Sequence, residues 1–389
     1  MNSKKAQIAI IAIFLVFTFA LSITFFALPK ADFSAQEKRS LSKFPEISFD
    51  SFLKGNLTAG LEGENGGFIP DHFPLRSFFV ATNAYMNLLL GNTAGTNYYN
   101  CDDGYIVTKP PSSDRSKINL RLLGDFAASF DEVTLAVVPS PGYIMEDKLP
   151  LIHADYKDDA VFDLINSKKA ANIKLCDLRE VFKASYTAGT DLYYKTDHHW
   201  TTKGAFIAYN ALCNTMDIEP ADMDNFRIKS HDGFYGTTYS SSGYFLNAPD
   251  TLEIWENENF SDSIKLTISD TDKGEIRNRE YSSMYFEERL SEPDMYPVFL
   301  NGNQPVVTIE NSKAQTDKTL LIFKDSYAHA ITPFFAENYQ KIVMVDMRYY
   351  DINAFGLVSE FAKNINADDC LFLYSMDSFM TDNSFAYLF

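Results

Sequence analysis

The sequence predicts an α/β protein in which a doubly wound parallel sheet is flanked by helices. Helical patterns lie between several of the predicted strands, and from residue 319 onward strand and helix alternate with short connections. Such alternation implies parallel neighbours joined by crossovers, and strands that are apolar throughout suit a sheet buried on both faces. The predicted strands are short runs rich in β-branched and aromatic residues: Val133–Val138, Ile173–Cys176, Thr319–Phe323, Ile342–Val345 and Cys370–Tyr374.

The chain begins with an uncharged apolar run, IAIIAIFLVFTFALSITFFAL, from Ile8 to Leu28. A run of about 20 apolar residues is long enough to cross a bilayer as a helix. Lys4 and Lys5 precede it, which predicts that the N-terminus stays in the cytoplasm and the rest of the chain lies outside. No good small-residue cleavage site follows, so a single-pass transmembrane anchor over residues 1–30 is favoured, with a cleaved signal peptide as the alternative.

Residues 31–96 are predicted to form a stalk and a docking helix. The stretch 31–66 is mixed polar and contains glycine, so little helix is expected there, whereas FPLRSFFVATNAYMNLLLG, from Phe73, has apolar residues at helical spacing and a closing Gly91. The α/β domain then occupies residues 97–389. It carries an inserted, mostly β segment over about 245–312, where TLEIWE and SIKLTISD alternate like half-buried antiparallel strands.

Charge and cysteine content exclude some functions. The formal net charge is −18 and the 34 basic residues form no long run, so no nucleic-acid partner is expected, because clustered Lys and Arg hold a phosphate backbone. Cys101, Cys176, Cys213 and Cys370 contain no C-x-x-C pair for zinc or redox chemistry. Outside the cytoplasm they permit up to two disulfides in any of three pairings. Buried free thiols are an equal alternative for Cys176 and Cys370, which lie in apolar segments.

Ser326 follows a predicted strand and precedes a predicted helix in LLIFKDSYAHAITPFF. Ligands of open α/β sheets bind at the carboxyl ends of strands, and the N-terminus of the helix would favour a developing oxyanion. The alternative is helix capping, since Asp-Ser before an apolar helix is ordinary capping chemistry. A serine hydroxyl becomes a good nucleophile only where an oriented base accepts its proton.

The stretch TDHHW offers the base and the group that orients it. If the segment is extended, side chains two apart point the same way, so Asp197 and His199 share a face and His198 turns to the other. Asp197 would then hold one ring nitrogen of His199, with the other facing Ser326 as in a catalytic triad. Trp200 is expected beneath the imidazole, or else as a plain core residue. A metal site is the alternative, but it needs three or four convergent ligands and adjacent histidines diverge; neither a metal nor a cofactor is expected.

TDHHWTTKGAFIAYNAL resembles the signature of the DHHW proteins, relatives of the alginate O-acetylation proteins AlgX and AlgJ in the SGNH hydrolase-like superfamily. The resemblance implies an SGNH-like fold and the catalytic set Asp197, His199 and Ser326, in an order permuted relative to other hydrolases of the superfamily. This chain has Lys324 where relatives often have a glycine before Asp-Ser. Further blocks agree in the order of the family: EKRSLSKFPEIS, FIPDHFPLRSFF, GYIV, YPVFLNGNQP, LLIFKDSYAHAITPFF and VDMRYYD.

Asn303 and Arg348 are candidates for oxyanion or substrate binding. The backbone N–H of Ser326 is the first oxyanion donor expected, and the resemblance implies a side-chain amide that Asn303 could supply; a Gly-Asn turn is the alternative. Arg348 follows the strand next to the nucleophile helix and could hold an oxyanion or a sugar hydroxyl. Its alternative is a surface ion pair with Asp346 or Asp351.

The resemblance implies a membrane-anchored, extracytoplasmic serine acyltransferase that O-acetylates a cell-surface or secreted polysaccharide through an acyl-serine intermediate. It also implies a polysaccharide acceptor and an acetyl donor, which a membrane-bound O-acyltransferase would deliver. Two alternatives stay open. One is a carbohydrate acetyl esterase with the same triad, in which water replaces the sugar, and the other is a non-catalytic glycan-binding or assembly protein.

Overall fold

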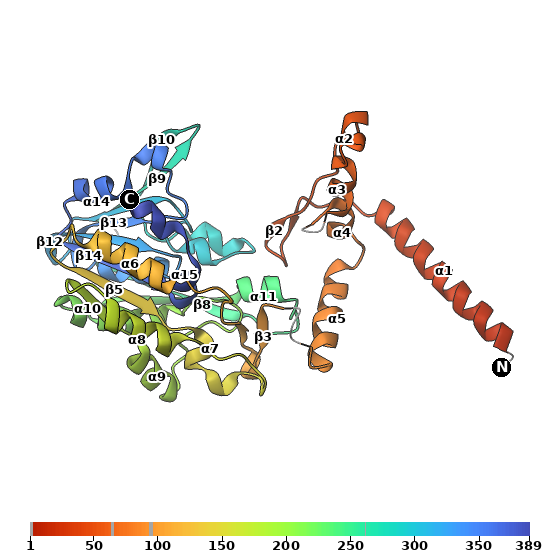
Figure 1. Cartoon of the computed structure of the whole chain (residues 1–389), viewed down its shortest axis with the longest axis horizontal. Coiled ribbons are helices and arrows are strands. Elements are labelled where there is room, and N and C mark those ends of the chain that lie inside the picture. The colour runs from red at the N-terminus through yellow and green to blue at the C-terminus, as the bar shows by residue number, and fades with distance from the viewer. Residues whose placement is uncertain (1–2, 64–65, 93–95, 261) are drawn as a thin grey trace. The chain divides into compact units, whose positions relative to one another are not determined.

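The computed structural model describes residues 3–63, 66–92, 96–260 and 262–389. The chain divides into two compact units (Figure 1). The smaller unit comprises residues 1–93 with 240–245, and the larger comprises residues 94–239 with 246–389. The residues predicted to carry the chemistry all belong to the larger unit.

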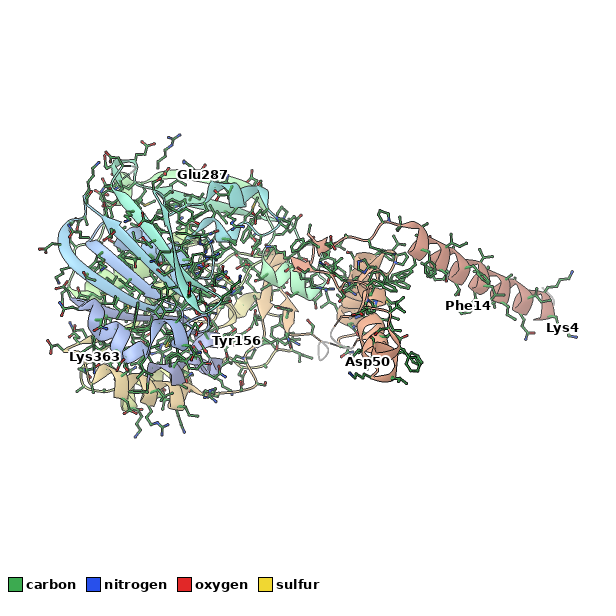
Figure 2. The ribbon with its side chains drawn as sticks, turned by 90° about the horizontal axis from the view of Figure 1, so that it is seen from above. Lys4, Phe14, Asp50, Tyr156, Glu287 and Lys363 are labelled. Carbon is green, nitrogen blue, oxygen red and sulfur yellow. The ribbon has the colours of Figure 1, made fainter. Side chains whose placement is uncertain are left out.

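The smaller unit starts with helix α1 (Ser3–Ala27), in which an 18-residue window of the stretch Lys4–Ala27 has a mean hydropathy of 2.7 and none of it is buried. Figure 2 shows the side chains of Lys4 and Phe14 on this helix. Its length and composition fit a membrane span, and a signal sequence would fit equally well. The described part of this unit also contains the end of α11 (Thr237–Ser242), two short strands and four more helices: β1 (Phe33–Ser34), β2 (Arg39–Ser40), α2 (Phe49–Leu53), α3 (Asn56–Glu62), α4 (Phe68–Asp71) and α5 (Arg76–Leu89).

Helices α2 and α3 correct the expectation of little helix before residue 66. Ser48 caps α2 by accepting a hydrogen bond from the N–H of Ser51, and such a cap satisfies one of the free donors of the first turn. The helix predicted from Phe73 is present as α5, and its docking role stays a prediction.

Two arginines join separate segments of the smaller unit. Arg39 donates to both carboxylate oxygens of Asp71, at 3.1 and 2.6 Å, and Arg76 donates to both oxygens of Glu37, at 2.8 and 3.1 Å. The hydrogen bonds from Arg39 outweigh the burial of Asp71 and hold the pKa of its carboxyl well below the usual value. The blocks EKRSLSKFPEIS and FIPDHFPLRSFF are thus paired through charge-assisted bonds.

The larger unit is built on an eight-stranded sheet in the order β10-β9-β11-β13-β12-β14-β5-β6 (Figure 1). The run from β13 to β6 is parallel, and β11, β9 and β10 continue it antiparallel. The sheet is therefore mixed and parallel-rich rather than wholly parallel. Its strands are β5 (Val133–Val138), β6 (Ile173–Asp177), β9 (Ile264–Asp272), β10 (Glu275–Tyr281), β11 (Val306–Asn311), β12 (Thr316–Lys324), β13 (Tyr339–Val345) and β14 (Asp369–Ser375).

The three antiparallel strands come from the segment predicted as an insertion. Val306 of β11 pairs with Val345 on one side and with Ser269 on the other, so this segment extends the main sheet rather than only decorating it. It covers the edge of β13, which would otherwise present unpaired backbone groups. Strand β8 (Asp250–Glu256) instead pairs with β7 (Arg227–Phe234), and β3 (Tyr98–Asn100) pairs with β4 (Ile106–Thr108).

Helices cover both faces of the main sheet, as the apolar strands predict. In β12, Leu320 and Ile322 belong to a core cluster shared with α9, α10 and α12, whereas Leu321 and Phe323 belong to one shared with α6, α8, α14 and α15. This period of two places alternate side chains on opposite faces. The helices are α6 (Ser116–Ala127), α7 (Pro141–Ile144), α8 (Asp158–Lys168), α9 (Arg179–Thr187), α10 (Thr202–Met216), α11 (Thr237–Ser242), α12 (Ala328–Phe335), α13 (Ile352–Phe355), α14 (Val358–Ile365) and α15 (Met376–Thr381).

All four cysteines are buried free thiols. Burial raises the pKa of Cys176 to about 11 and that of Cys213 to about 12. Of the two alternatives left by the sequence, the structure has the free thiols, which pack as small apolar side chains.

Candidate active site

Residues 196–200 form a tight turn between the two arms of a short antiparallel bridge. Tyr193 pairs with Trp200, and the N–H of Thr201 donates to the carbonyl of Leu192 at 2.9 Å. Thr201 also caps α10 by accepting from the N–H of Gly204 at 3.0 Å. The bridge and the cap fix the turn at both ends.

Asp197 and His199 meet within this turn, although the segment is bent and not extended as expected. The N–H of His199 donates to Oδ1 of Asp197 at 2.9 Å, and the same oxygen lies 2.5 Å from Nδ1 of the His199 ring. An aspartate that bonds its own backbone two residues on forms such a turn by itself. The turn also brings the ring of His198 to 3.8 Å from that of His199 between centroids, so His198 does not point to the opposite face.

The second ring nitrogen of His199 faces the serine. Its Nε2 lies 2.7 Å from Oγ of Ser326, which is 127 residues further along the chain. Asp197 is 2% exposed and His199 is 4% exposed. The structure thus brings together the three side chains that the sequence singles out, with the imidazole between the carboxylate and the hydroxyl.

The pKa of the Asp197 carboxyl is lowered despite its burial. Burial alone would raise its pKa, but His199, His198 and a backbone N–H together hold the pKa of this carboxyl well below the usual value. The N–H is that of Thr237, which donates to Oδ2 at 2.6 Å while its hydroxyl donates to the same oxygen at 3.1 Å. Gly236 comes so close that an added Cβ would lie 2.4 Å from Oδ2. A negative charge behind the imidazole stabilises the imidazolium that forms when the ring accepts a proton.

The same three residues offer possible metal ligands. Ligand atoms of Asp197, His198 and His199 all lie within 4.8 Å of one another, so the adjacent histidines do not diverge as the sequence suggested. Both ring nitrogens of His199 are already hydrogen-bonded, and Nδ1 of His198 lies 2.6 Å from the Thr237 hydroxyl. The side-chain atoms that could bind a metal are therefore already engaged in hydrogen bonds, and those of His199 suit proton transfer.

Tyr296, rather than Trp200, packs against the imidazole of His199. Its ring is stacked on that of His199 with 3.8 Å between centroids and 8° between planes. It lies in a short 3-10 helix, Tyr296–Val298, in the YPVFLNGNQP block. Trp200 is fully buried and donates its indole N–H to the carbonyl of Tyr327 at 3.1 Å. No local sequence signal pointed to Thr237 or Tyr296, because each meets the turn from a distant segment.

Asp325 and Lys324 fix the turn that carries Ser326. The Asp325 carboxylate accepts from the N–H of Tyr327 at 2.9 Å and from the N–H of Ser375 at 2.8 Å, which ties this turn to the end of β14. The Lys324 side chain is 1% exposed, and its Nζ lies 3.0 Å from Asp346 and 2.7 Å from Nε2 of His329. The lysine found in place of a glycine is therefore held in a buried ion pair.

Ser326 borders a cavity of about 110 Å³ at the carboxyl edge of the parallel strands. Residues that follow β5, β13 and β14 line it as well, among them Pro139, Arg348 and Asp377, together with His198. This is the edge at which open α/β sheets bind ligands.

Arg348 and Asn303, the two oxyanion or substrate-binding candidates, are placed differently. Arg348 lines the cavity while its Nε and Nη2 bind Asp346 at 2.8 and 2.6 Å, so the ion pair and the position at the cavity occur together. Asn303 is exposed, donates to the Tyr349 hydroxyl at 3.2 Å and does not line this cavity. Among the described residues, no acceptor is found for the N–H of Ser326, which leaves it available to an oxyanion.

Comparisons with known proteins bear on the fold described above. The family model described as DHHW protein matches residues 150–345. A crystal structure of a DHHW family protein from Eubacterium siraeum is 23% identical over 73% of this chain and 92% of its own, with a TM-score of 0.62. Bacillus cereus PatB1 with a sulfonyl adduct is 22% identical over 76% of this chain and 99% of its own, with a TM-score of 0.63. No curated protein matches the chain.

Proposed function

This chain belongs to the DHHW family, and from that premise we propose that it is an extracytoplasmic serine acyltransferase that O-acetylates a polysaccharide. One observation carries the proposal: a single buried imidazole, that of His199, lies 2.5 Å from the Asp197 carboxylate and 2.7 Å from the Ser326 hydroxyl. This is the arrangement that activates a serine, because the base is within reach of the hydroxyl proton and is oriented from behind. The proposal includes an SGNH-like arrangement of the α/β core.

In the first half of the reaction, Nε2 of His199 accepts the Ser326 proton while Oγ attacks the acyl carbonyl of the donor. The oxyanion that forms would be bound by the N–H of Ser326 and the guanidinium of Arg348, since donors aimed at developing charge lower the barrier. The bond to the leaving group of the donor then breaks, and that group takes the proton from His199. An acetyl ester on Ser326 remains.

In the second half, a sugar hydroxyl gives its proton to the same Nε2 and attacks the acetyl ester. Collapse of the second tetrahedral intermediate returns the proton to Oγ of Ser326 and releases the O-acetylated glycan. Water in place of the sugar would make the enzyme an acetyl esterase. The cavity of about 110 Å³ beside Ser326 favours an acyl group as short as acetyl.

Helix α1 supports the proposed location. A span with Lys4 and Lys5 at its cytoplasmic end would anchor the chain with its catalytic unit outside. A donor made in the cytoplasm must then cross the bilayer, so we include in the proposal a membrane-bound O-acyltransferase that delivers acetyl groups.

The test uses the full chain in detergent with p-nitrophenyl acetate, with and without candidate oligosaccharides. We expect p-nitrophenol release, an acetyl adduct on Ser326 by mass spectrometry, and acetylated sugar when the acceptor is present. The sulfonyl adduct of PatB1 suggests a sulfonyl fluoride as a second probe, which should modify Ser326. Ser326→Ala should abolish all of these, whereas Ser312→Ala, outside the cavity, should abolish none.

The other outcomes separate the alternatives. Acetate release at the same rate with and without sugar, and no acetylated sugar, would establish an esterase. If turnover is unchanged in Ser326→Ala, the hypothesis of a serine enzyme is contradicted and a glycan-binding protein is favoured.

A further inference from the structure

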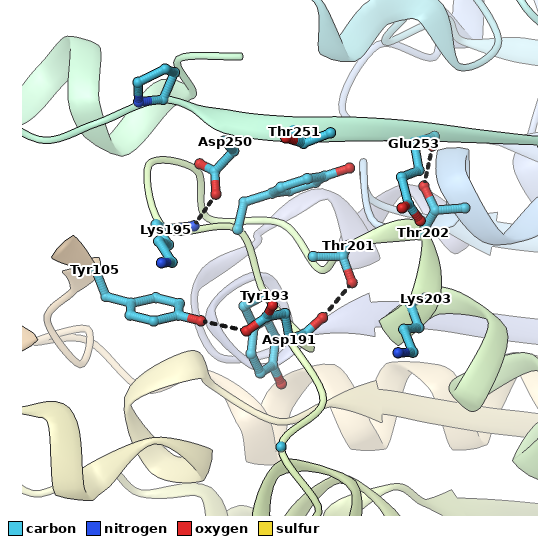
Figure 3. A pocket seen from close by; sticks show the side chains of 13 residues that line it. Tyr105, Asp191, Tyr193, Lys195, Thr201, Thr202, Lys203, Asp250, Thr251 and Glu253 are labelled. Carbon is cyan, nitrogen blue, oxygen red and sulfur yellow. Dashed lines mark hydrogen bonds between the residues drawn. The ribbon is translucent and has the colours of Figure 1, made fainter. Parts of the chain in front are cut away.

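A second, larger cavity of about 390 Å³ lies beside the turn that carries Asp197 and His199 (Figure 3). Its wall includes both arms of that turn, Tyr193–Lys195 before it and Thr201–Lys203 after it, and the start of β8. Neither Ser326 nor His199 lines it. The cavity is therefore separate from the one at the nucleophile, although the two are built on the same loop.

Several polar groups in this wall have unused hydrogen-bonding capacity. Tyr194 is 3% exposed, and its buried hydroxyl has no hydrogen-bond partner among the residues that the structure describes. The nearby Thr202 hydroxyl already donates to the carbonyl of Glu253 at 2.5 Å. A buried polar group without a partner is costly, so a ligand that bonds the Tyr194 hydroxyl would gain what the free protein lacks.

The charged groups of the wall also keep free positions. Glu253 uses Oε2 to accept from the Trp255 indole at 3.0 Å, and Asp191 uses Oδ1 for the Tyr105 hydroxyl at 3.4 Å. Within the described part of the chain, no ion pair involves Lys203, whose side chain borders the cavity as Figure 3 shows. The wall thus offers both donors and acceptors to a ligand.

This combination fits a saccharide better than an anion. Hydroxyl groups donate and accept at once, which matches a wall that offers both donors and acceptors. Three carboxylates against two ammonium groups give the wall no excess of positive charge; they belong to Asp191, Asp250 and Glu253, and to Lys195 and Lys203. The volume also lies in the range of small-molecule sites, about 300 to 1,000 Å³.

We propose that this cavity is a saccharide subsite that binds a neutral part of the glycan. The proposal rests on the proposed function and names where that glycan is held apart from Ser326. The wall is tied to the catalytic turn, because the Asp250 carboxylate accepts from the N–H of Lys195 and from the N–H of Thr196, each at 2.8 Å. A sugar bound here contacts residues that flank Asp197 and His199.

Binding is tested on the full chain in detergent, in the Ser326→Ala background so that no turnover occurs. Saturation-transfer NMR and calorimetry are run with cellotetraose, maltotetraose and N-acetylchitotetraose, with tetragalacturonate and inorganic phosphate as anionic probes. We expect at least one neutral tetrasaccharide to bind and to protect Lys203 from amine acetylation, read by mass spectrometry. Binding of the anionic probes alone, or of no probe, overturns the proposal.

Tyr194→Phe is the decisive variant. It removes a hydroxyl that has no partner in the free protein, so the melting temperature should not fall, while saccharide affinity should fall about fivefold or more. Lys203→Met and Glu253→Gln should each weaken binding about tenfold, as expected for a hydrogen bond to a charged group, and Lys168→Met, exposed on α8, should not. Affinity unchanged in all three cavity variants overturns the proposal.

Failure of the subsite and failure of the proposed function are distinguishable. If p-nitrophenyl acetate leaves no acetyl group on Ser326 of the native chain, the catalytic role of Ser326 is refuted, while saccharide binding to Ser326→Ala is unaffected. If the enzyme is active but its saccharide affinity is unchanged by substitutions at Tyr194, Lys203 and Glu253, only the proposed subsite is refuted.

Discussion

The ring of Tyr296 lies parallel to the imidazole of His199, 3.8 Å away and tilted by 8°. Asp197 holds one edge of the imidazole and Tyr296 covers one face, so the ring has little freedom to turn away from Ser326. The hydroxyl of Tyr296 donates a long hydrogen bond to the carbonyl of Ser326, at 3.4 Å. The contact therefore depends on the aromatic ring more than on its hydroxyl.

Tyr296→Phe should keep kcat within about threefold of the native value, because it keeps the ring, whereas Tyr296→Leu should lower kcat about tenfold or more. Release of p-nitrophenol from the acetate ester measures both. Tyr387→Leu, at an exposed site, is the control and should have no effect. Equal losses in the Phe and Leu variants would show that the hydroxyl, not the stacking, matters.

Gly236→Ala should disturb the acid of the proposed triad. An added Cβ would lie 2.2 Å from Cβ of Asp197, so the carboxylate must shift, and a shift of about 1 Å can cost about 100-fold in rate. We expect kcat to fall by that order with an unchanged far-ultraviolet circular dichroism spectrum. The matched control is Gly124→Ala in α6, where the new Cβ would meet only Ala170 at 3.8 Å; full activity in Gly236→Ala would contradict the role of Asp197.

Lys324→Met tests the buried ion pair beside the turn that carries Ser326. Lys324 and Asp346 are 1% and 0% exposed in their side chains and lie 3.0 Å apart, and removing one partner of a buried pair costs about 3–5 kcal/mol. Because Arg348 still contacts Asp346, we expect the loss in the free energy of unfolding, measured by urea unfolding, to lie at the lower end of this range. The double variant Lys324→Met with Asp346→Asn should cost less than the sum of the single changes; strict additivity would mean that the pair is not coupled.

Asp71→Asn tests the ion pair of the smaller unit and its dependence on pH. The pKa of Asp71 is lowered in the folded chain, chiefly by Arg39, so its stabilisation is present above the unfolded value of about 3.9 and is lost as pH falls toward the folded value. At pH 7 we expect Asp71→Asn to lower the free energy of unfolding by about 1–2 kcal/mol. The smaller value is favoured because the Arg39 side chain is 35% exposed.

Hydrogen exchange of peptides covering residues 36–76 measures this loss. In the native chain, protection should decrease as pH falls below about 4, after correction for intrinsic exchange. In Asp71→Asn that step should be missing. An identical pH profile in both chains would show that Asp71 does not set it.

Much of the parallel half of the sheet could be predicted, because five apolar runs separated by helical patterns leave few other arrangements. The pairing of β9 with β11 could not, since alternation identifies a strand but not its neighbour. The meeting of Asp197, His199 and Ser326 could be predicted from the chemistry that a serine needs together with the resemblance to the DHHW proteins, although the local reason is a bend and not an extended segment. Thr237, Tyr296 and the Lys324–Asp346 pair were not predictable, because each joins segments far apart in the chain.

The four cysteine side chains are buried as free thiols. None is bonded to another, so the fold is complete without any oxidant, and dithiothreitol should leave its melting temperature unchanged. A chain of this kind can mature equally well in the presence or absence of oxygen and makes no demand on enzymes that form or shuffle disulfides.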